Sequence, residues 1–312
     1  SPHQHNVTSY NITVLAIFSL EAFAGMWINA VIVCALCIGW VKKKILNSNE
    51  KILLLLGCSR FWYLCFSWTY SFLSKIYPYC LLVHPILQLL QGVYSFFTCS
   101  NFWFSACLCF FYCIKIANFR SRFFIYLKVK IDRIVPWLLL GSVIFSLTIG
   151  ILVYNIIEKA VCKSLNFTCQ GRFWKETIRI EEHLYPIHFL TGFVYSISFT
   201  AVIFSAVFLL FSLWRHKRKM QTNSMNSLSV DAHIRAMKSI LSFFIMYSIN
   251  FISLILTLIY STKYQNHVMF LVYLLQHAFP GIHSLILIFS NPKLEKALLK
   301  ILSCVKCKVC MR

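Results

Sequence analysis

Two ionisable residues, Glu21 and Arg60, lie inside long apolar stretches of this 312-residue chain. Each costs several kcal/mol in a bilayer unless it is paired or hydrated. Glu21, Gly25 and Asn29 recur at every fourth position, so they share one helix face, and the small Gly25 permits close helix approach. We expect this face to meet the segment near Arg60. The link is a direct ion pair, a bridging water, or instead hydrogen bonds from Arg60 to backbone carbonyls.

Residues of the kinds that carry out catalysis are scarce. The chain has nine acidic residues and ten His, and no two His stand at ligand spacing beside an acid. We find no metal motif, nucleophile elbow, phosphate-binding loop or paired catalytic carboxylates. We therefore expect no enzyme active site, no metal and no other cofactor. Intramembrane charge is also too sparse for a proton-coupled transporter.

Seven apolar segments must position the charged pair. A hydrophobic fraction of 59% and a mean hydropathy of +0.71 are typical of a polytopic membrane protein. Since about 20 apolar residues span a bilayer as a helix, we place spans at 12–41, 52–77, 85–114, 135–157, 185–214, 236–261 and 268–290. They predict an all-α membrane protein in which residues 1–312 form a single seven-helix domain.

The basic residues indicate the orientation of the bundle. Most of the 30 Lys and Arg fall in alternate connections and the tail, at 42–60, 115–133, 215–238 and 293–312. Positive residues stay cytoplasmic, so the tail 1–11 is predicted outside and the tail 291–312 inside. The net charge of +21 is compatible with nucleic acid, but charges that flank membrane spans need only meet anionic lipids. We expect membrane lipids, and no nucleic acid, as partners.

Three N-x-[ST] acceptor sites fall on the predicted outer side, at Asn6, Asn11 and Asn166. Asn11 lies too near the membrane, so glycans are expected on Asn6 and Asn166. The predicted outer side also carries three cysteines that an oxidising compartment can join in one disulfide, with every pairing open: Cys80, Cys162 and Cys169.

The C-terminal tail predicts a short amphipathic eighth helix. After Pro292, apolar residues at 294, 298, 301 and 302 form one face and lysines the other, which suits the inner membrane surface. The tail cysteines lack a fourth zinc ligand and are interpreted as palmitoylation sites or as free thiols: Cys304, Cys307 and Cys310.

Four segments carry distinctive motifs. They are Ser59-Arg60; Phe111-Tyr112-Cys113-Ile114-Lys115-Ile116-Ala117-Asn118-Phe119; Trp214-Arg215-His216-Lys217 with Asp231-Ala232-His233 and Ala236-Met237-Lys238; and His283-Ser284-Leu285-Ile286 with Asn291-Pro292-Lys293-Leu294. In this order, the segments resemble the bitter taste receptors, or type 2 taste receptors, which are G-protein-coupled receptors. The nearest alternative is a type 1 vomeronasal-like chemoreceptor, and a membrane transporter or channel is more remote.

The resemblance implies a plasma-membrane receptor whose outer half binds small, often bitter agonists and which activates a gustducin-type heterotrimeric G protein. The family's ligand positions map to Trp68, Ser71, Tyr94, Thr98, Asn250, Tyr273, Gln276 and His277. Coupling and switching are assigned to Arg60, Lys115, His216, His233, Lys238, His283 and Ser284. The ligand and the oligomeric state stay open.

Overall fold

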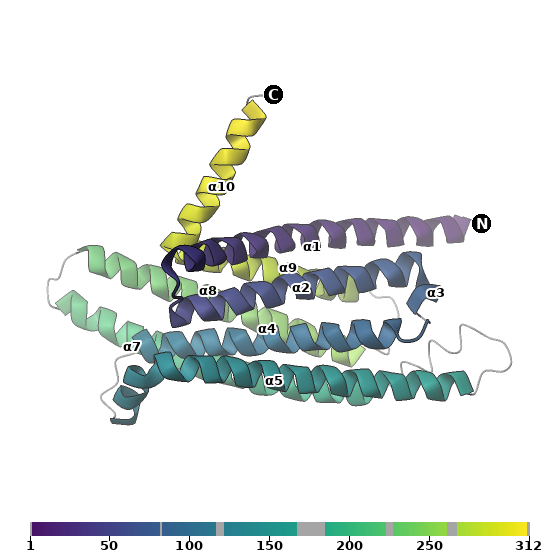
Figure 1. The fold of residues 1–312 in the computed structure, drawn as a ribbon, viewed down its shortest axis with the longest axis horizontal. Coiled ribbons are helices and arrows are strands. Elements are labelled where there is room, and N and C mark those ends of the chain that lie inside the picture. Colours follow the sequence, from purple (N-terminus) through teal and green to yellow (C-terminus); the bar gives the residue numbers. More distant parts are fainter. Residues whose placement is uncertain are drawn as a thin grey trace.

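The computed structural model describes residues 2–81, 83–116, 122–166, 185–222, 227–260 and 267–310. Within these ranges, every regular element is a helix (Figure 1). The helices are α1 (Pro2–Lys43), α2 (Ser48–Ile76), α3 (Pro78–Leu81), α4 (Ile86–Ile116), α5 (Arg122–Asn166), α7 (Tyr185–Thr222), α8 (Ser227–Tyr260), α9 (His267–Ser290) and α10 (Pro292–Cys310).

The long helices lie side by side as a bundle (Figure 1). Six of them (α1, α2, α4, α5, α7 and α9) contain stretches long and apolar enough to cross a membrane, and α8 contributes the shorter apolar stretch Leu241–Thr257. The arrangement is consistent with the predicted seven-helix bundle. Helix α5 extends well beyond the predicted span 135–157 at both ends, because a helix continues into polar sequence where an apolar window stops.

Helix α4 is the central helix of the bundle. Within the 18-residue apolar window of its candidate span 78% of the residues are buried, against 33% in the corresponding window of α5, which lies on the outside. One apolar core joins α4 to α1, α2, α5, α9 and α10, and a second joins it to α5, α7, α8 and α9. A side chain on α4 can therefore face most of the other helices.

Glycine allows two helix pairs to approach closely. A Cβ on Gly150 would stand 2.9 Å from the carbonyl oxygen of Gly92, which joins α5 to α4. A Cβ on Gly281 of α9 would stand 3.3 Å from the Cα of Gly25 in α1. Backbone contact of this kind is how helices pack in lipid.

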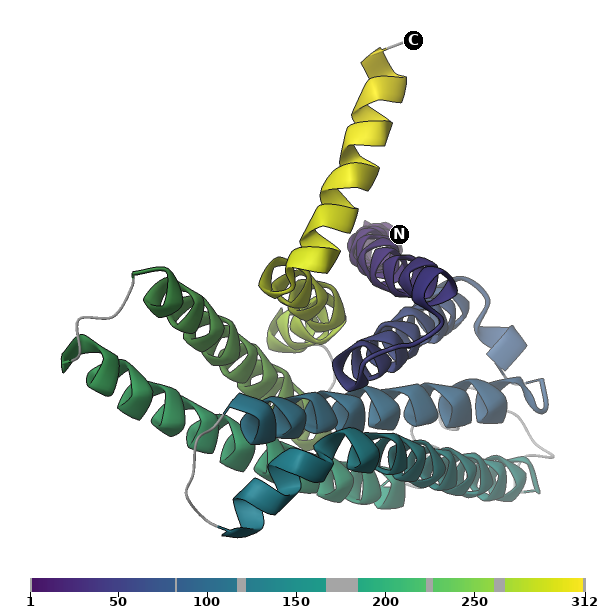
Figure 2. The ribbon, with the colours of Figure 1, turned by 60° about the vertical axis from the view of Figure 1, so that its left-hand side comes forward.

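Helix α10 leaves the bundle beside the end of α1 and points away from it (Figures 1 and 2). Leu294 and Leu298 are buried against the core that contains α1 and α9, while Lys296 and Lys300 are exposed. Leu302, which belongs to the expected apolar face, is exposed, and the placement of α10 on the inner membrane surface stays a prediction.

Candidate functional site

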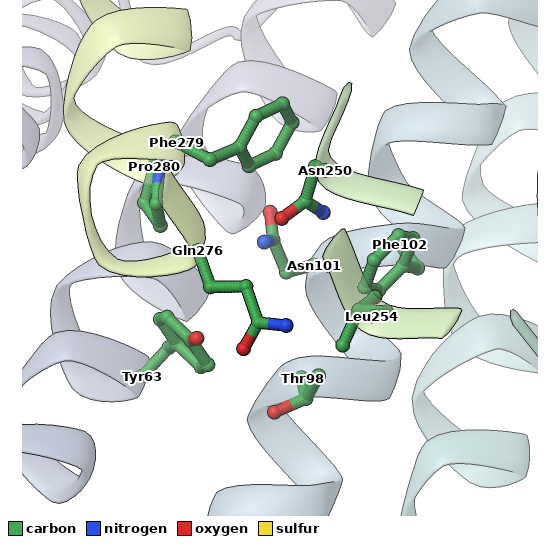
Figure 3. Close-up of a pocket in the computed structure, with 9 residues that line it drawn as sticks. All are labelled: Tyr63, Thr98, Asn101, Phe102, Asn250, Leu254, Gln276, Phe279 and Pro280. Carbon is green, nitrogen blue, oxygen red and sulfur yellow. The ribbon is translucent and has the colours of Figure 1, made fainter. Parts of the chain in front are cut away.

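A small cavity lies between α2, α4, α8 and α9 (Figure 3). Three amides, two hydroxyls and four largely apolar residues line it: Asn101, Asn250, Gln276, Tyr63, Thr98, Phe102, Leu254, Phe279 and Pro280. A few polar groups in a mostly apolar wall are typical of a small-molecule site.

The cavity is nearly closed in this structure. Its volume is about 10 Å³, close to the minimum that one water molecule needs. Small-molecule pockets usually measure roughly 300–1,000 Å³. Side chains or helices must therefore move apart before a compound can enter.

The polar groups of the cavity already hold hydrogen bonds. The Thr98 hydroxyl donates to the carbonyl oxygen of Tyr94 over 2.7 Å, and the Gln276 amide donates to the Thr257 hydroxyl over 2.7 Å. A hydroxyl or amide that donates one bond can still accept another. A ligand that enters would find acceptors facing it from α4 and α9.

Of the eight ligand positions expected from sequence, the structure places Thr98, Asn250 and Gln276 in the cavity wall. Tyr94 lies one turn outward from Thr98. Its ring packs against that of Tyr63 with centroids 5.3 Å apart, and the two hydroxyl oxygens are 3.4 Å apart. Tyr94 therefore supports a lining residue from behind.

His277 also lies behind the cavity, where α1, α2 and α9 meet. Its Nε2 is 2.6 Å from the Ser67 hydroxyl, and its ring stacks on Phe18 at 4.8 Å. Its Nδ1 is 2.9 Å from the carbonyl oxygen of Tyr273. These contacts hold His277 in the helix interface.

The remaining expected positions face elsewhere. Trp68 donates from Nε1 to the Ser19 hydroxyl over 2.9 Å and packs against Phe72, which places it beside α1. Ser71 is half-buried, and the Tyr273 side chain is 38% exposed. None of the three lines the cavity described above.

Arg60 is fully buried directly beside this cavity. Its Nε donates to Asn101 Oδ1 over 3.0 Å, and its Nη1 donates to the Ser284 hydroxyl over 2.9 Å. Its Nη2 lies 3.4 Å from the Ser105 hydroxyl and contacts His283 Nδ1. Because Nδ1 accepts from a guanidinium, the His283 imidazole is neutral. We call Arg60 and these four partners the arginine centre.

The arginine centre reaches α1 through Ser284. The Ser284 hydroxyl donates to Asn29 Oδ1 over 2.7 Å, and the Asn29 amide donates to the carbonyl oxygen of Gly25 over 2.8 Å. The chain of hydrogen bonds thus links α1, α2, α4 and α9. In the described part of the protein, the partners of Arg60 are neutral.

The link expected between the Glu21 face of α1 and Arg60 is made through a different residue of that face. Arg60 bonds to side chains of α4 and α9, with neither Glu21 nor backbone carbonyls among the partners. Glu21 Oε2 is buried without a hydrogen-bond partner among the described residues. Gly25 faces both Leu64 of α2 and Gly281 of α9. Asn29, two turns along, is the residue of this face that reaches the arginine centre.

Two residues that line the cavity, Asn101 and Phe279, connect it to the arginine centre. Asn101 lines the cavity and also accepts the hydrogen bond from Arg60 Nε. Phe279 lines the cavity, and its ring centroid is 5.5 Å from that of His283. The His283 ring also lies 4.5 Å from that of Phe243 on α8. A movement of the cavity wall therefore acts directly on side chains that contact Arg60.

At the basic end of the bundle, Lys115 forms an ion pair with Asp132 of α5 over 2.8 Å. The other residues expected to contact a G protein, His216, His233 and Lys238, lie in α7 and α8, but their side chains fall outside the described residues. The side chains of Asn6, Asn166 and Cys162 and the whole of Cys169 are likewise not described. Cys80 is a free thiol in the structure.

Several residues that line the cavity were not predicted from the sequence. Asn101 had a readable signal, because Tyr94, Thr98, Asn101 and Ser105 recur at helical spacing on one face of α4. Phe102, Leu254 and Phe279 had none, since Phe and Leu occur in every span. Pro280 was visible only as a proline inside the seventh span.

Comparisons with known proteins agree on one family. The family model described as "Taste receptor protein (TAS2R)" matches residues 7–306. Taste receptor type 2 member 2 of Homo sapiens is 28% identical over 95% of this chain and 97% of its own length. Member 41 of Pan paniscus is 32% identical over 92% and 94%, and member 7 of Papio hamadryas 30% identical over 93% of each chain. The resemblance seen in the four motifs is confirmed: the chain belongs to the taste receptor type 2 family and is a multi-pass membrane receptor, not an enzyme.

Proposed function

We propose that this bitter taste receptor binds small agonists in the cavity between α2, α4, α8 and α9, and that the occupied receptor activates a gustducin-type heterotrimeric G protein. Thr98, Asn250 and Gln276 orient the agonist through hydrogen bonds, and Phe102 and Phe279 pack against its apolar part. Tyr94 and His277 shape the wall from behind through Tyr63 and Ser67.

The observation that carries the proposal is the double contact of Asn101. Its side chain lines the cavity and accepts a hydrogen bond from a buried guanidinium. An agonist that bonds to this amide, or pushes it aside, competes directly with Arg60. No other residue in the described chain both lines the cavity and bonds to Arg60.

An agonist acts only by binding one helix arrangement better than another. The closed cavity favours the empty arrangement, whereas entry of an agonist requires α8 or α9 to move away from α4. Phe243 and His283 belong to those two helices and touch each other. Movement at the cavity is therefore coupled to the contacts that hold Arg60.

The G protein docks at the basic end of the bundle, which we place in the cytoplasm, with the N-terminus outside. Lys115, His216, His233 and Lys238 belong to the helix ends that would open there. Lys115 is held by Asp132 in this structure, which ties α4 to α5. Helix α10 lies on the inner membrane surface, and the outer sequons at Asn6 and Asn166 carry glycan.

The test is a calcium response in cells that express the full-length chain. A panel of bitter compounds is applied with and without a co-expressed gustducin-type G protein. A response to at least one compound that requires the G protein supports the proposal. A compound-evoked current or uptake in cells without the G protein would instead identify a channel or transporter.

A further inference from the structure

A second hollow, larger than the ligand cavity, lies at the basic end of α1. It has a volume of about 250 Å³ and is formed by the end of α1, the turn into α2 and the start of α10. We call it the α1–α10 groove. Its apolar wall consists of Ala35, Leu36, Ile38, Gly39, Leu46, Leu294 and Ala297, and its charged rim consists of Lys42, Lys43, Glu50 and Lys293.

The rim carries an excess of positive charge with one carboxylate inside it. Lys293 forms an ion pair with Glu50, which also accepts a hydrogen bond from the Asn47 backbone N–H over 3.1 Å. The hydrogen bond that Lys293 donates to Glu50 raises the pKa of Lys293, so Lys293 stays charged at cytosolic pH. Lys42 and Lys43 are exposed beside this pair. Three ammonium groups and one carboxylate therefore face the groove.

The floor of the groove is open. A Cβ on Gly39 would meet no heavy atom within 4 Å, although Gly39 lines the groove. The neighbouring side chains Ile38 and Val41 are 57% and 77% exposed, as lipid-facing residues are. Helix α10 turns away from the bundle at this point (Figure 2). We infer from the exposed Ile38 and Val41 that the groove opens toward the bilayer.

The position of the rim matches the depth of phospholipid headgroups. Along α1 the apolar sequence ends and Lys42, Lys43 and Lys44 follow at once. Lysines at the end of a span lie at the membrane–water interface, where anionic lipids attract them. An occupant of the groove is therefore anionic at one end and apolar at the other.

We propose that the α1–α10 groove is a binding site for a phospholipid with a serine headgroup. The phosphate and carboxylate lie among Lys42, Lys43 and Lys293, the headgroup ammonium pairs with Glu50, and the start of one acyl chain covers Ile38 and Gly39. A choline headgroup brings no net negative charge. A polyphosphoinositide brings no cation to Glu50. The serine headgroup alone among these three matches both signs of charge on the rim.

The test uses the purified full-length receptor in detergent and native mass spectrometry. Phosphatidylserine, phosphatidylcholine and phosphatidylinositol bisphosphate are titrated separately, and the bound lipid is counted. We expect phosphatidylserine to bind at least about tenfold more tightly than phosphatidylcholine, since each interfacial lysine contributes about fivefold. We also expect it to bind more tightly than the bisphosphate.

Two matched pairs of variants distinguish lipid binding in the groove from a general attraction of anionic lipid to the basic surface. Gly39→Leu fills the groove, whereas Gly141→Leu adds the same bulk on α5, where a Cβ also meets no atom within 4 Å. Lys42→Gln/Lys43→Gln removes two rim charges. Lys296→Gln/Lys300→Gln removes the same charge from the exposed face of α10. Only the first member of each pair should lower phosphatidylserine affinity, by about tenfold or more.

Three results would each overturn the proposal. They are equal affinity of the wild type for phosphatidylserine and phosphatidylcholine, equal losses within either pair of variants, and tighter binding of the bisphosphate. All variants change open or exposed positions, so monodisperse elution is expected throughout. These measurements need no agonist or G protein, and their outcome is independent of the proposed function.

Discussion

The ligand cavity and the arginine centre lie side by side and are held together in different ways. In the cavity, Thr98 donates a hydrogen bond within its own helix, and Gln276 donates one to the adjacent α8. Arg60 instead bonds to four side chains on two other helices, and the network continues to a third.

Because of this difference, the cavity wall can rearrange more easily than the arginine centre. Breaking one local bond in the cavity frees a hydroxyl or amide that a ligand can satisfy in turn. Breaking a bond at the arginine centre leaves part of a buried charge without an acceptor, which is far more costly. We therefore propose that the cavity adapts to more than one compound, while the arginine centre permits few helix arrangements.

The largest expected effect follows from Arg60→Leu. The change leaves the buried polar groups of Asn101, Ser105 and Ser284 without their donor. An unsatisfied buried polar group costs about 1–3 kcal/mol, so stability should fall by about 3 kcal/mol or more. The measurement is the thermal unfolding midpoint of the purified receptor. Thr69→Val is the control, because Thr69 bonds only to the Cys65 carbonyl of its own helix. Equal unfolding midpoints for the two variants would contradict the claim that the bonds of Arg60 stabilise the bundle more than a hydrogen bond within one helix does.

Gln276→Leu and Thr98→Val test the role of the cavity wall. Each removes one hydrogen-bonding group from the cavity wall, worth about 1–2 kcal/mol, so the half-maximal agonist concentration should rise about 5- to 30-fold. Maximal response should hold. Ser196→Ala on α7 is the control, since its hydroxyl donates to Gly192 within the helix and lies outside the cavity wall. A dose–response unaltered at both cavity positions would place the agonist elsewhere.

Leu254→Ala should have a smaller effect of the opposite sign. Truncation of this lining residue widens a cavity of about 10 Å³, which lowers the cost of opening it. Bulky agonists should gain about threefold in potency, measured as calcium dose–response at matched surface expression. Leu256→Ala removes the same atoms from α8 outside the lining. A gain in both variants would point to general loosening of α8.

The sequence predicted the helices well and the site in part. The predicted span 268–290 agrees with α9, His267–Ser290, because apolar length follows membrane thickness. Arg60 stood out as a charge in an apolar run. Its partners did not, because Asn101 and Ser284 are distant in sequence and only packing brings them together. Phe102 and Phe279 were hidden among the 29 phenylalanines of the chain.

A separate prediction concerns His233, which we place where α8 meets the G protein. A neutral imidazole can donate one hydrogen bond and accept another. His233→Ala should change basal or maximal signalling by about two- to tenfold, the value of one hydrogen bond, and leave agonist binding nearly intact. Both responses are read at matched surface expression. Wild-type values would leave His233 as a solvated residue without a part in coupling.

The comparison of Asn101→Ala with Asn250→Ala tests the link between the two regions most directly. Both residues are buried amides in the cavity wall, but only Asn101 contacts Arg60. Agonist dose–response curves at matched surface expression are the measurement. We predict that Asn250→Ala raises the half-maximal concentration alone, whereas Asn101→Ala also changes the basal or maximal response. Curves that shift identically in the two variants would contradict transmission from the cavity to the arginine centre through Asn101.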